Sequence, residues 1–229
     1  MSVKIAIIDS GINPDHFHVD GIEKGLGFYL NDKKQIMKSG DFTDIVGHGT
    51  AIAGIIKKKA PFAKLYAVKI FNQKLTASAS VLIAALNWAI DNRMQIVNLS
   101  LGTKLLKYKK AIEQICAKAY KKNIFIVSSA KHILDITFPA VFNTVIGVCK
   151  NPDCNEDTIA YYPKNSIEFG ACGMPRAIPG LPQELNFSGA SFAAAHISGI
   201  IASKLKKNSN ANIKGVKREL TAESINVYE

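Results

Sequence analysis

Short, continuous apolar runs alternate along the chain with longer stretches in which apolar residues recur every three or four positions. A continuous apolar run is typical of a parallel strand buried on both faces, whereas the longer spacing is typical of a helix with one buried face. We therefore predict strands at residues 3–8, 25–30, 64–70, 95–99, 124–128 and 144–149. We predict helices at residues 48–58, 78–92 and 105–121, a helix that contains Ser191, and a short last helix after residues 208–212.

The order of these elements predicts an α/β fold. Strands that alternate with helices form a parallel sheet with helices on both faces. The 229 residues, 48% of them hydrophobic, allow one large core, and no linker or internal repeat divides them, so we expect a single domain over residues 1–229. Reactive groups in such folds collect at the carboxyl ends of the strands, where Asp9 and Ser100 lie.

Ser191 begins a helix made of very small residues, among them Ala193, Ala194 and Ala195. A helix with so little side-chain volume can run through the middle of a domain. A serine at its first turn lies among free backbone N–H groups, where the helix dipole favours negative charge. Taken alone, Ser191 is either a helix cap or a nucleophile, since serine is a preferred N-cap residue.

Two further residues have the chemistry that a nucleophilic serine needs. Asp9 ends the first strand and is followed by a glycine turn, and His48 begins a helix with a glycine on either side. Singly, an acid after a strand is a common turn or cap residue, and a histidine at a helix start is commonly structural. Together with Ser191 they supply a nucleophile, a base, and a group that orients the base.

The residues around these three positions carry a family resemblance. The chain resembles the subtilisin family of serine peptidases, from about Lys4 to about Ser203. The matching stretches are Ile7-Ile8-Asp9-Ser10-Gly11-Ile12, Gly47-His48-Gly49-Thr50-Ala51-Ile52-Ala53-Gly54, Leu65-Tyr66-Ala67-Val68-Lys69, Ile96-Val97-Asn98-Leu99-Ser100-Leu101-Gly102 and Gly189-Ala190-Ser191-Phe192-Ala193-Ala194.

The resemblance implies a three-layer α/β/α fold with a mostly parallel sheet, and an endopeptidase that works through an acyl-enzyme. Ser191 would attack the scissile carbonyl, His48 would carry the proton, and Asp9 would orient His48. A peptide or protein substrate would bind in extended form between two strands, which correspond to Ser100, Leu101 and Gly102 and to Lys74, Leu75, Thr76 and Ala77. The family's inserted calcium loop has no counterpart here, so we expect neither a metal nor a cofactor.

The chain departs from the family after the strand at residues 124–128. The family has Gly-Asn there, and its asparagine amide is an oxyanion donor; counting places Lys131 and His132 at those two positions. The resemblance therefore implies an oxyanion hole made of the Ser191 backbone N–H and the His132 ring. The pocket for the residue before the cut would include Ser129, Ala130 and Lys131, with Lys131 favouring an acidic side chain. This departure also motivates an alternative, an inactive relative that binds peptides in the same groove.

The formal net charge of +11 raises the question of a nucleic-acid partner. The lysines mostly fall on helix ends and exposed helix faces with few aromatic residues between them, so we predict a solvated surface and no nucleic-acid binding.

The four cysteines lack the spacing of a zinc site, and Cys116 falls on the apolar stripe of a helix. No apolar run is long enough to span a membrane, and no signal peptide precedes the first strand, so we expect a cytoplasmic protein.

Overall fold

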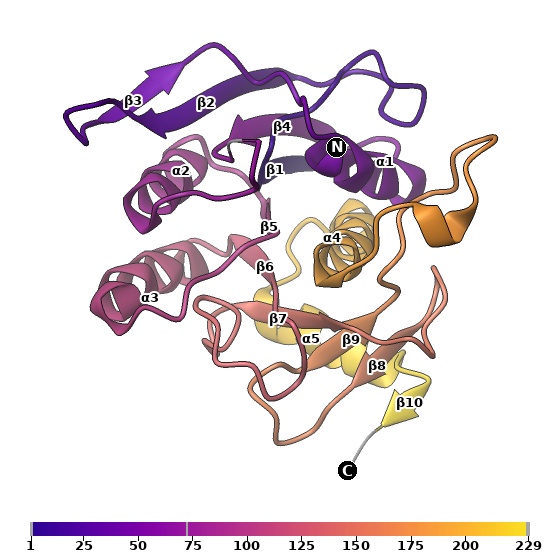
Figure 1. Cartoon of the computed structure of the whole chain (residues 1–229). Helices are drawn as coiled ribbons and strands as arrows, with labels where there is room; N and C mark the ends of the chain where they lie inside the picture. The colour runs from indigo at the N-terminus through magenta and orange to yellow at the C-terminus, as the bar shows by residue number, and fades with distance from the viewer. Residues whose placement is uncertain (1, 72, 228–229) are drawn as a thin grey trace.

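The computed structural model describes residues 2–71 and 73–227. Within this part of the chain, ten strands form one sheet in the order β10-β8-β9-β7-β6-β5-β1-β4-β2-β3 (Figure 1). The strands are β1 (Lys4–Asp9), β2 (Lys24–Leu30), β3 (Ile36–Ser39), β4 (Lys64–Lys69), β5 (Ile96–Leu99), β6 (Phe125–Ser129), β7 (Ile146–Lys150), β8 (Ile159–Tyr161), β9 (Phe169–Ala171) and β10 (Asn226–Val227). The β2–β3 and β8–β9 pairs are antiparallel and the remaining pairs are parallel.

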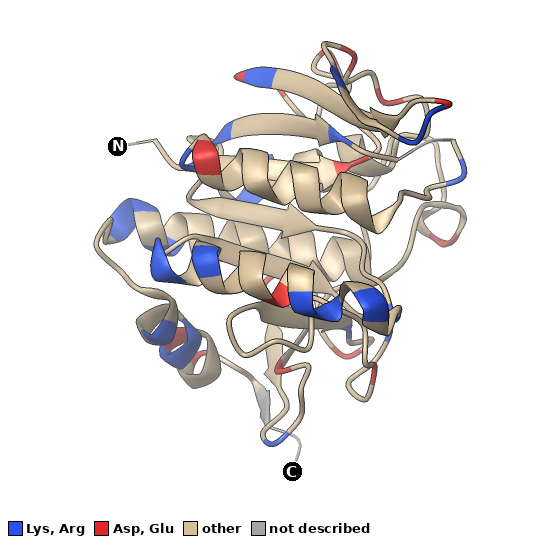
Figure 2. Ribbon diagram, turned by 90° about the vertical axis from the view of Figure 1, so that its left-hand side faces the viewer, with Lys and Arg blue, Asp and Glu red and all other residues tan. Residues whose placement is uncertain are grey.

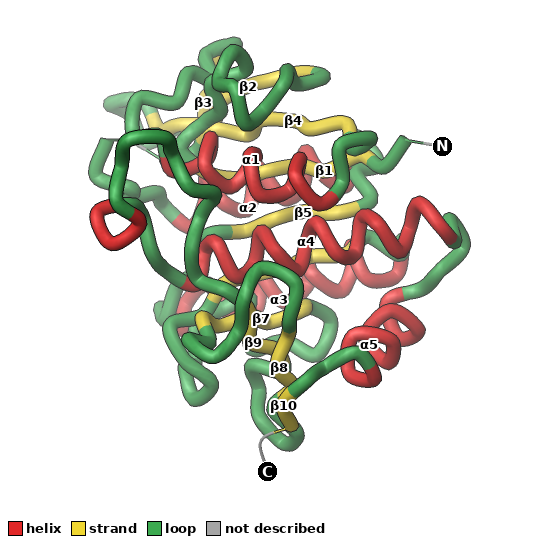
Figure 3. Tube along the Cα trace, turned by 90° about the vertical axis from the view of Figure 1, so that its right-hand side faces the viewer, coloured by secondary structure: helices red, strands yellow, loops and turns green. Residues whose placement is uncertain are grey.

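Helices cover both faces of the sheet, which makes the three α/β/α layers that the sequence predicts. Helices α1 and α4 pack on one face and α2 and α3 on the other (Figures 1 and 3). The helices are α1 (His48–Lys59), α2 (Ala79–Asp91), α3 (Leu106–Lys121), α4 (Ala190–Lys207) and α5 (Ile213–Ala222), with a short 3-10 helix at Gln183–Leu185.

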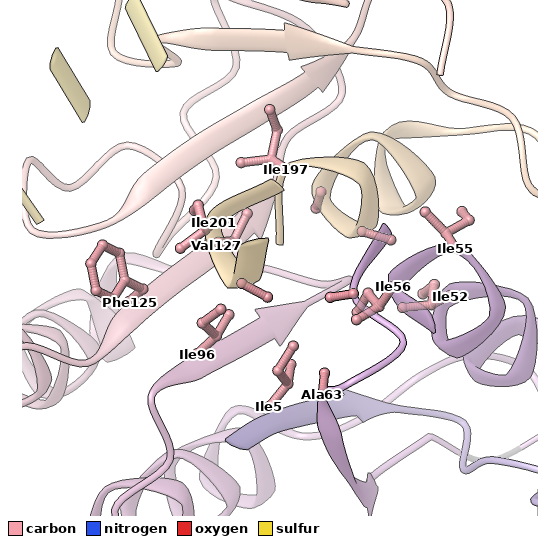
Figure 4. Close-up of a cluster of buried hydrophobic side chains, with 14 of the residues drawn as sticks. Ile5, Ile52, Ile55, Ile56, Ala63, Ile96, Phe125, Val127, Ile197 and Ile201 are labelled. Atoms are coloured by element: carbon pink, nitrogen blue, oxygen red, sulfur yellow. The ribbon is translucent and has the colours of Figure 1, made fainter. Parts of the chain in front are cut away.

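The central strand β1 explains why the apolar runs are continuous. Its side chains alternate between two cores: Ile5 and Ile7 pack in the cluster beneath α1 and α4, whereas Ala6 and Ile8 pack in the cluster beneath α2 and α3. Because both faces of the strand are buried, neither set of alternate positions can be polar. Figure 4 shows the first cluster, in which side chains of β1, β5 and β6 point toward the isoleucines of α1 and α4.

Helix α4 lies in the interior of the molecule. It packs against β5, β6, β7, β9 and α1, and residues Phe192 to Gly199 are all buried. The small residues permit this close packing: a Cβ added at Gly199 would lie 2.8 Å from the Cβ of Lys59 on α1. The residue that precedes this buried run is Ser191, so its position is fixed by the core.

The sequence-based boundaries of the main elements agree with the structure to within about two residues, but several short strands were missed. Strand β3 lies at the edge of the sheet, and its exposed side chains lack an apolar pattern. Strands β8 and β9 have three residues each and lie in a stretch for which the sequence pattern predicts no strand. Lys74 to Ala77 form a turn and loop and not a strand, and Leu75 has a positive φ of 53°.

Lysines occupy the exposed face of α3, as expected for a solvated surface (Figure 2). Across the described part of the chain, the helices are too short or too polar to cross a lipid bilayer.

Candidate active site

The end of β1 meets the start of α1 through a buried hydrogen bond. Asp9 is the last residue of β1, His48 is the first residue of α1, and His48 Nδ1 lies 2.7 Å from Asp9 Oδ1. The same carboxylate oxygen accepts the backbone N–H of Ser10 at 2.7 Å. Asp9 is fully buried and His48 is 8% exposed, so solvent reaches only a small part of the pair, on the histidine.

A glycine is needed for these two elements to approach so closely. A Cβ at Gly49 would lie 2.1 Å from the Gly11 carbonyl oxygen and 3.2 Å from the Asp9 Cβ. The Gly49 N–H instead donates to Ser10 Oγ at 3.0 Å, which links the first turn of α1 to the turn after β1.

Asp44 stabilises the turn that precedes His48, and sequence reasoning missed it. Its Oδ1 accepts the backbone N–H groups of Val46 at 3.1 Å and Gly47 at 2.8 Å, and its Oδ2 accepts the N–H and the hydroxyl of Thr50 at 2.8 and 2.6 Å. Ser10 Oγ lies 2.9 Å from Asp44 Oδ1 and 3.1 Å from Asp9 Oδ1, and its single proton serves one of them at a time. An acid shortly before a helix start is a known capping signal that could have identified Asp44.

The two carboxylates determine the protonation of His48. Burial alone lowers the pKa of His48, but the hydrogen bond to Asp9 and the negative charges of Asp9 and Asp44 raise it more, so the net shift is upward from 6.5. The site therefore stabilises the imidazolium, the form that a histidine base takes after it accepts a proton.

Ser191 is the second residue of α4 and does not cap that helix. The N-cap is Gly189, no side chain caps the helix, and Ser191 Oγ donates to the Ser100 carbonyl at 3.4 Å. The ring of the next residue, Phe192, lies 5.2 Å from the ring of His48, so the start of α4 is held beside the Asp9–His48 pair. Within the described residues, Ser191 makes no hydrogen bond with His48.

A pocket of about 360 Å³ opens beside Ser191. Its walls are the segment after β5 and the segment after β6, so the structure brings six of the predicted substrate-binding residues together with Ser191. These six are Ser100, Leu101, Gly102, Ser129, Ala130 and Lys131. Of the predicted opposite strand, Ala77 lies in a neighbouring pocket with Leu101 and Gly102, and Thr76 in another pocket beside β2 and β4. Lys74 and Leu75 lie in the turn before them.

His132 lies in the turn after β6. Its side chain is exposed, its carbonyl accepts the N–H of Asp135 at 3.0 Å, and it is not among the residues that line the pocket beside Ser191. The structure thus places His132 one residue beyond the pocket wall.

The pocket contains a buried carboxylate that the sequence did not reveal. The side chain of Asp135 is 1% exposed; its Oδ1 lies 2.8 Å from Lys104 Nζ, and its Oδ2 accepts the Lys131 backbone N–H at 2.9 Å. Burial raises the pKa of Asp135. The Lys104 ammonium and the hydrogen bonds from the Lys131 N–H and Thr137 outweigh the effect of burial and lower the pKa to about 2. Asp135 is therefore ionised at neutral pH.

A second cavity, of about 240 Å³, lies on the other side of His48. It is lined by the turn before α1, by His16 and His18, and by the segment around Arg176 and Phe187. The Phe187 ring, which lines this cavity, meets the His48 ring edge-on at 5.9 Å, so the cavity wall contacts the candidate base.

The four cysteines pack in the interior of the fold. All four are free and buried, and burial raises the pKa of Cys116 to about 12, as expected for a structural thiol. Nowhere in residues 2–71 or 73–227 do three or more His, Cys, Asp or Glu side chains gather as a metal site.

Comparison with known proteins gives consistent matches. The model of the Subtilase family matches residues 1–226. The minor extracellular protease Epr of Bacillus subtilis (strain 168) is 30% identical over 215 residues, which are 88% of this chain and 32% of Epr. Subtilisin DY of Bacillus licheniformis is 26% identical over 251 residues, with 99% of this chain and 85% of the relative covered. The chain thus spans about a third of the length of Epr and most of subtilisin DY.

The fold is also found in solved structures. A cold adapted subtilisin-like serine proteinase superimposes with a TM-score of 0.71 at 20% identity, covering 96% of this chain and 81% of the other. A lanthipeptide protease superimposes with a TM-score of 0.72 at 21% identity, covering 94% and 78%.

Proposed function

The chain belongs to the subtilase family, and from this premise we propose that it is a serine endopeptidase whose catalytic residues are Asp9, His48 and Ser191. The observation that carries the proposal is the buried 2.7 Å hydrogen bond between His48 and Asp9, beside which Phe192 holds the first turn of α4. We further propose that residues 1–229 act as one peptidase domain.

The mechanism follows from the order of these groups. Ser191 Oγ leaves the Ser100 carbonyl, gives its proton to His48 Nε2, and attacks the scissile carbonyl carbon. His48 then holds two protons, and its Nδ1–H donates to Asp9, which stabilises the positive charge. His48 returns one proton to the leaving amine, and the amide bond breaks. A water molecule then gives a proton to His48 and attacks the ester carbonyl, and His48 passes that proton to Ser191 Oγ as the ester bond breaks.

The tetrahedral oxyanion needs hydrogen-bond donors. The backbone N–H of Ser191 is available, because the first N–H groups of a helix have no partner within the helix. For the second donor we propose the ring of His132, which is exposed and lies next to the pocket wall.

The substrate in this proposal is an extended peptide that adds to the segment Ser100, Leu101 and Gly102. One structural neighbour is a lanthipeptide protease, which makes a specialised processing peptidase the narrower form of the proposal. The alternative is a peptide-binding protein without activity. It is motivated by Lys131 and His132 at the family's Gly-Asn position and by the Ser191 hydroxyl that donates to Ser100 and not to His48.

Labelling with a fluorophosphonate probe separates these two functions, because the probe requires an activated serine. We expect stoichiometric labelling of the wild-type chain and none of Ser191→Ala. Ser188→Ala is the matched control, since Ser188 is exposed three residues earlier, and it should label like the wild type. A folded wild-type sample that does not label would support the inactive binder.

A further inference from the structure

Two separate segments that form the walls of the pocket beside Ser191 contact one another. Thr103 and Phe138 exchange backbone hydrogen bonds at 2.8 and 2.9 Å, which fastens the segment after β5 to the connection after β6. A Cβ at Gly102 would lie 2.1 Å from Thr137 Cγ2, so the two walls are in close contact there. The Lys104–Asp135 ion pair crosses between the same two walls.

Positive charges outnumber negative charges in the lining of this pocket. The charge of Asp135 is already paired with Lys104 at its Oδ1, its Oδ2 accepts the Lys131 N–H, and its side chain is 1% exposed, so a substrate cation has little access to it. Lys131 has an exposed side chain, and within the described residues it forms no ion pair with a carboxylate. The pocket lining therefore contains two ammonium groups and one carboxylate, and the unpaired charge is that of Lys131.

We propose that this pocket binds an acidic side chain, glutamate or aspartate, on the substrate residue whose carbonyl Ser191 attacks. The proposal rests on the proposed peptidase function and adds the substrate class. Lys131 carries its ammonium on a flexible four-carbon stem and forms the ion pair with the substrate carboxylate. A basic side chain is excluded, because it would have to displace Lys104 from Asp135 while facing the charge of Lys131.

The test measures binding, so that it does not depend on turnover. Fluorescently labelled peptides that are identical except for a last residue of Glu, Gln or Lys are titrated by fluorescence polarisation with the Ser191→Ala chain. We expect the Glu peptide to bind about fivefold tighter than its isostere Gln, the effect of one partly screened ion pair, and the Lys peptide to bind most weakly.

Substitutions at Lys131, each combined with Ser191→Ala, identify the group responsible. Lys131→Gln should bring the Glu:Gln ratio close to one, and Lys131→Glu should make the Lys peptide the tighter ligand. Both keep the backbone N–H that binds Asp135, so the pocket wall stays intact. Lys33→Glu is the matched control for Lys131→Glu: it makes the same change in net charge at an exposed lysine outside the pocket and should leave the ratios unchanged.

Tighter binding of the Lys or Gln peptide by the parent chain would overturn the proposal, as would a Glu:Gln ratio that Lys131→Gln does not alter. Both results are independent of the peptidase function, which the fluorophosphonate label on Ser191 tests separately.

Discussion

The Asp44 carboxylate holds Thr50 through two hydrogen bonds, at 2.8 Å from the backbone nitrogen and 2.6 Å from the hydroxyl, across the helix start that carries His48. An anion at this place satisfies a free N–H of the first helical turn and adds negative potential near the imidazole. Asp44 is thus a positioning residue for His48.

Asp44→Asn should move the acid limb of the kcat/KM profile to lower pH. His48 acts as a base only when neutral, so activity rises as the pH passes its pKa, which lies above 6.5 in the wild type. Removing the Asp44 charge removes one cause of that upward shift, while the asparagine keeps one side-chain acceptor. Asp32→Asn, at an exposed loop position, is the control, and an acid limb at the wild-type pH in Asp44→Asn would contradict the role of Asp44.

His132→Ala should slow acylation by about 10²-fold, the loss that follows removal of one oxyanion donor, with the magnitude taken from subtilisin, a relative of this chain. His132→Asn should retain most of the rate, because the amide can donate in place of the ring. Single-turnover release of the first product measures this step. If His132→Ala acylates at the wild-type rate, His132 lies outside the oxyanion hole.

Gly49→Ala should destabilise the chain by about 1–3 kcal/mol, the usual cost of overpacking. The new methyl group would overlap the Gly11 carbonyl oxygen at 2.1 Å and push α1 away from Asp9. Alanine normally favours a helix over glycine, so a loss of stability requires this clash. Chemical denaturation measures it, with Gly40→Ala as the control because a Cβ there meets nothing within 4 Å.

His196 should make the fold less stable in acid. Burial lowers the pKa of His196 from 6.5 to about 4. The hydrogen bond between its ring nitrogen and the Met174 carbonyl, at 3.1 Å, raises the pKa but by less than burial lowers it. Between these two pH values the unfolded chain binds a proton that the native chain does not, so the free energy of unfolding falls as the pH falls through this window.

The contribution of His196 is at most about 1.4 kcal/mol per pH unit. His196→Gln cannot titrate and should flatten the dependence of the unfolding free energy on pH between 6.5 and 4. Urea unfolding at a series of pH values gives the slope, and equal slopes for the two chains would show that the pKa of His196 is the same in the native and unfolded states.

The sequence predicted the interior strands and the helices well, for a physical reason. Strands such as β1 and β5 are buried on both faces, and the helices bury one face, so each leaves a clear apolar pattern. The edge strand β3 has exposed side chains, and β9 has only three residues, so their existence depends on neighbouring strands that a local pattern cannot describe.

The candidate site likewise contains residues that a local sequence pattern identifies and residues that it does not. Asp9 and His48 stand in distinctive glycine-rich stretches at element ends, and the structure joins them by a hydrogen bond. The Lys104–Asp135 pair links residues 31 positions apart through side chains, and nothing in either local sequence indicates the partner. Such a pair becomes visible only once the two segments are folded together.

Helix α4 carries Ser191 at one end, and the residues that follow it, Phe192 to Gly199, are buried against strands and α1. The hydroxyl that we propose as the nucleophile therefore lies at the start of a buried helical segment and not on a surface loop. Heat should therefore abolish labelling of Ser191 and melt the core over the same narrow temperature range, leaving no populated state that is folded yet inert.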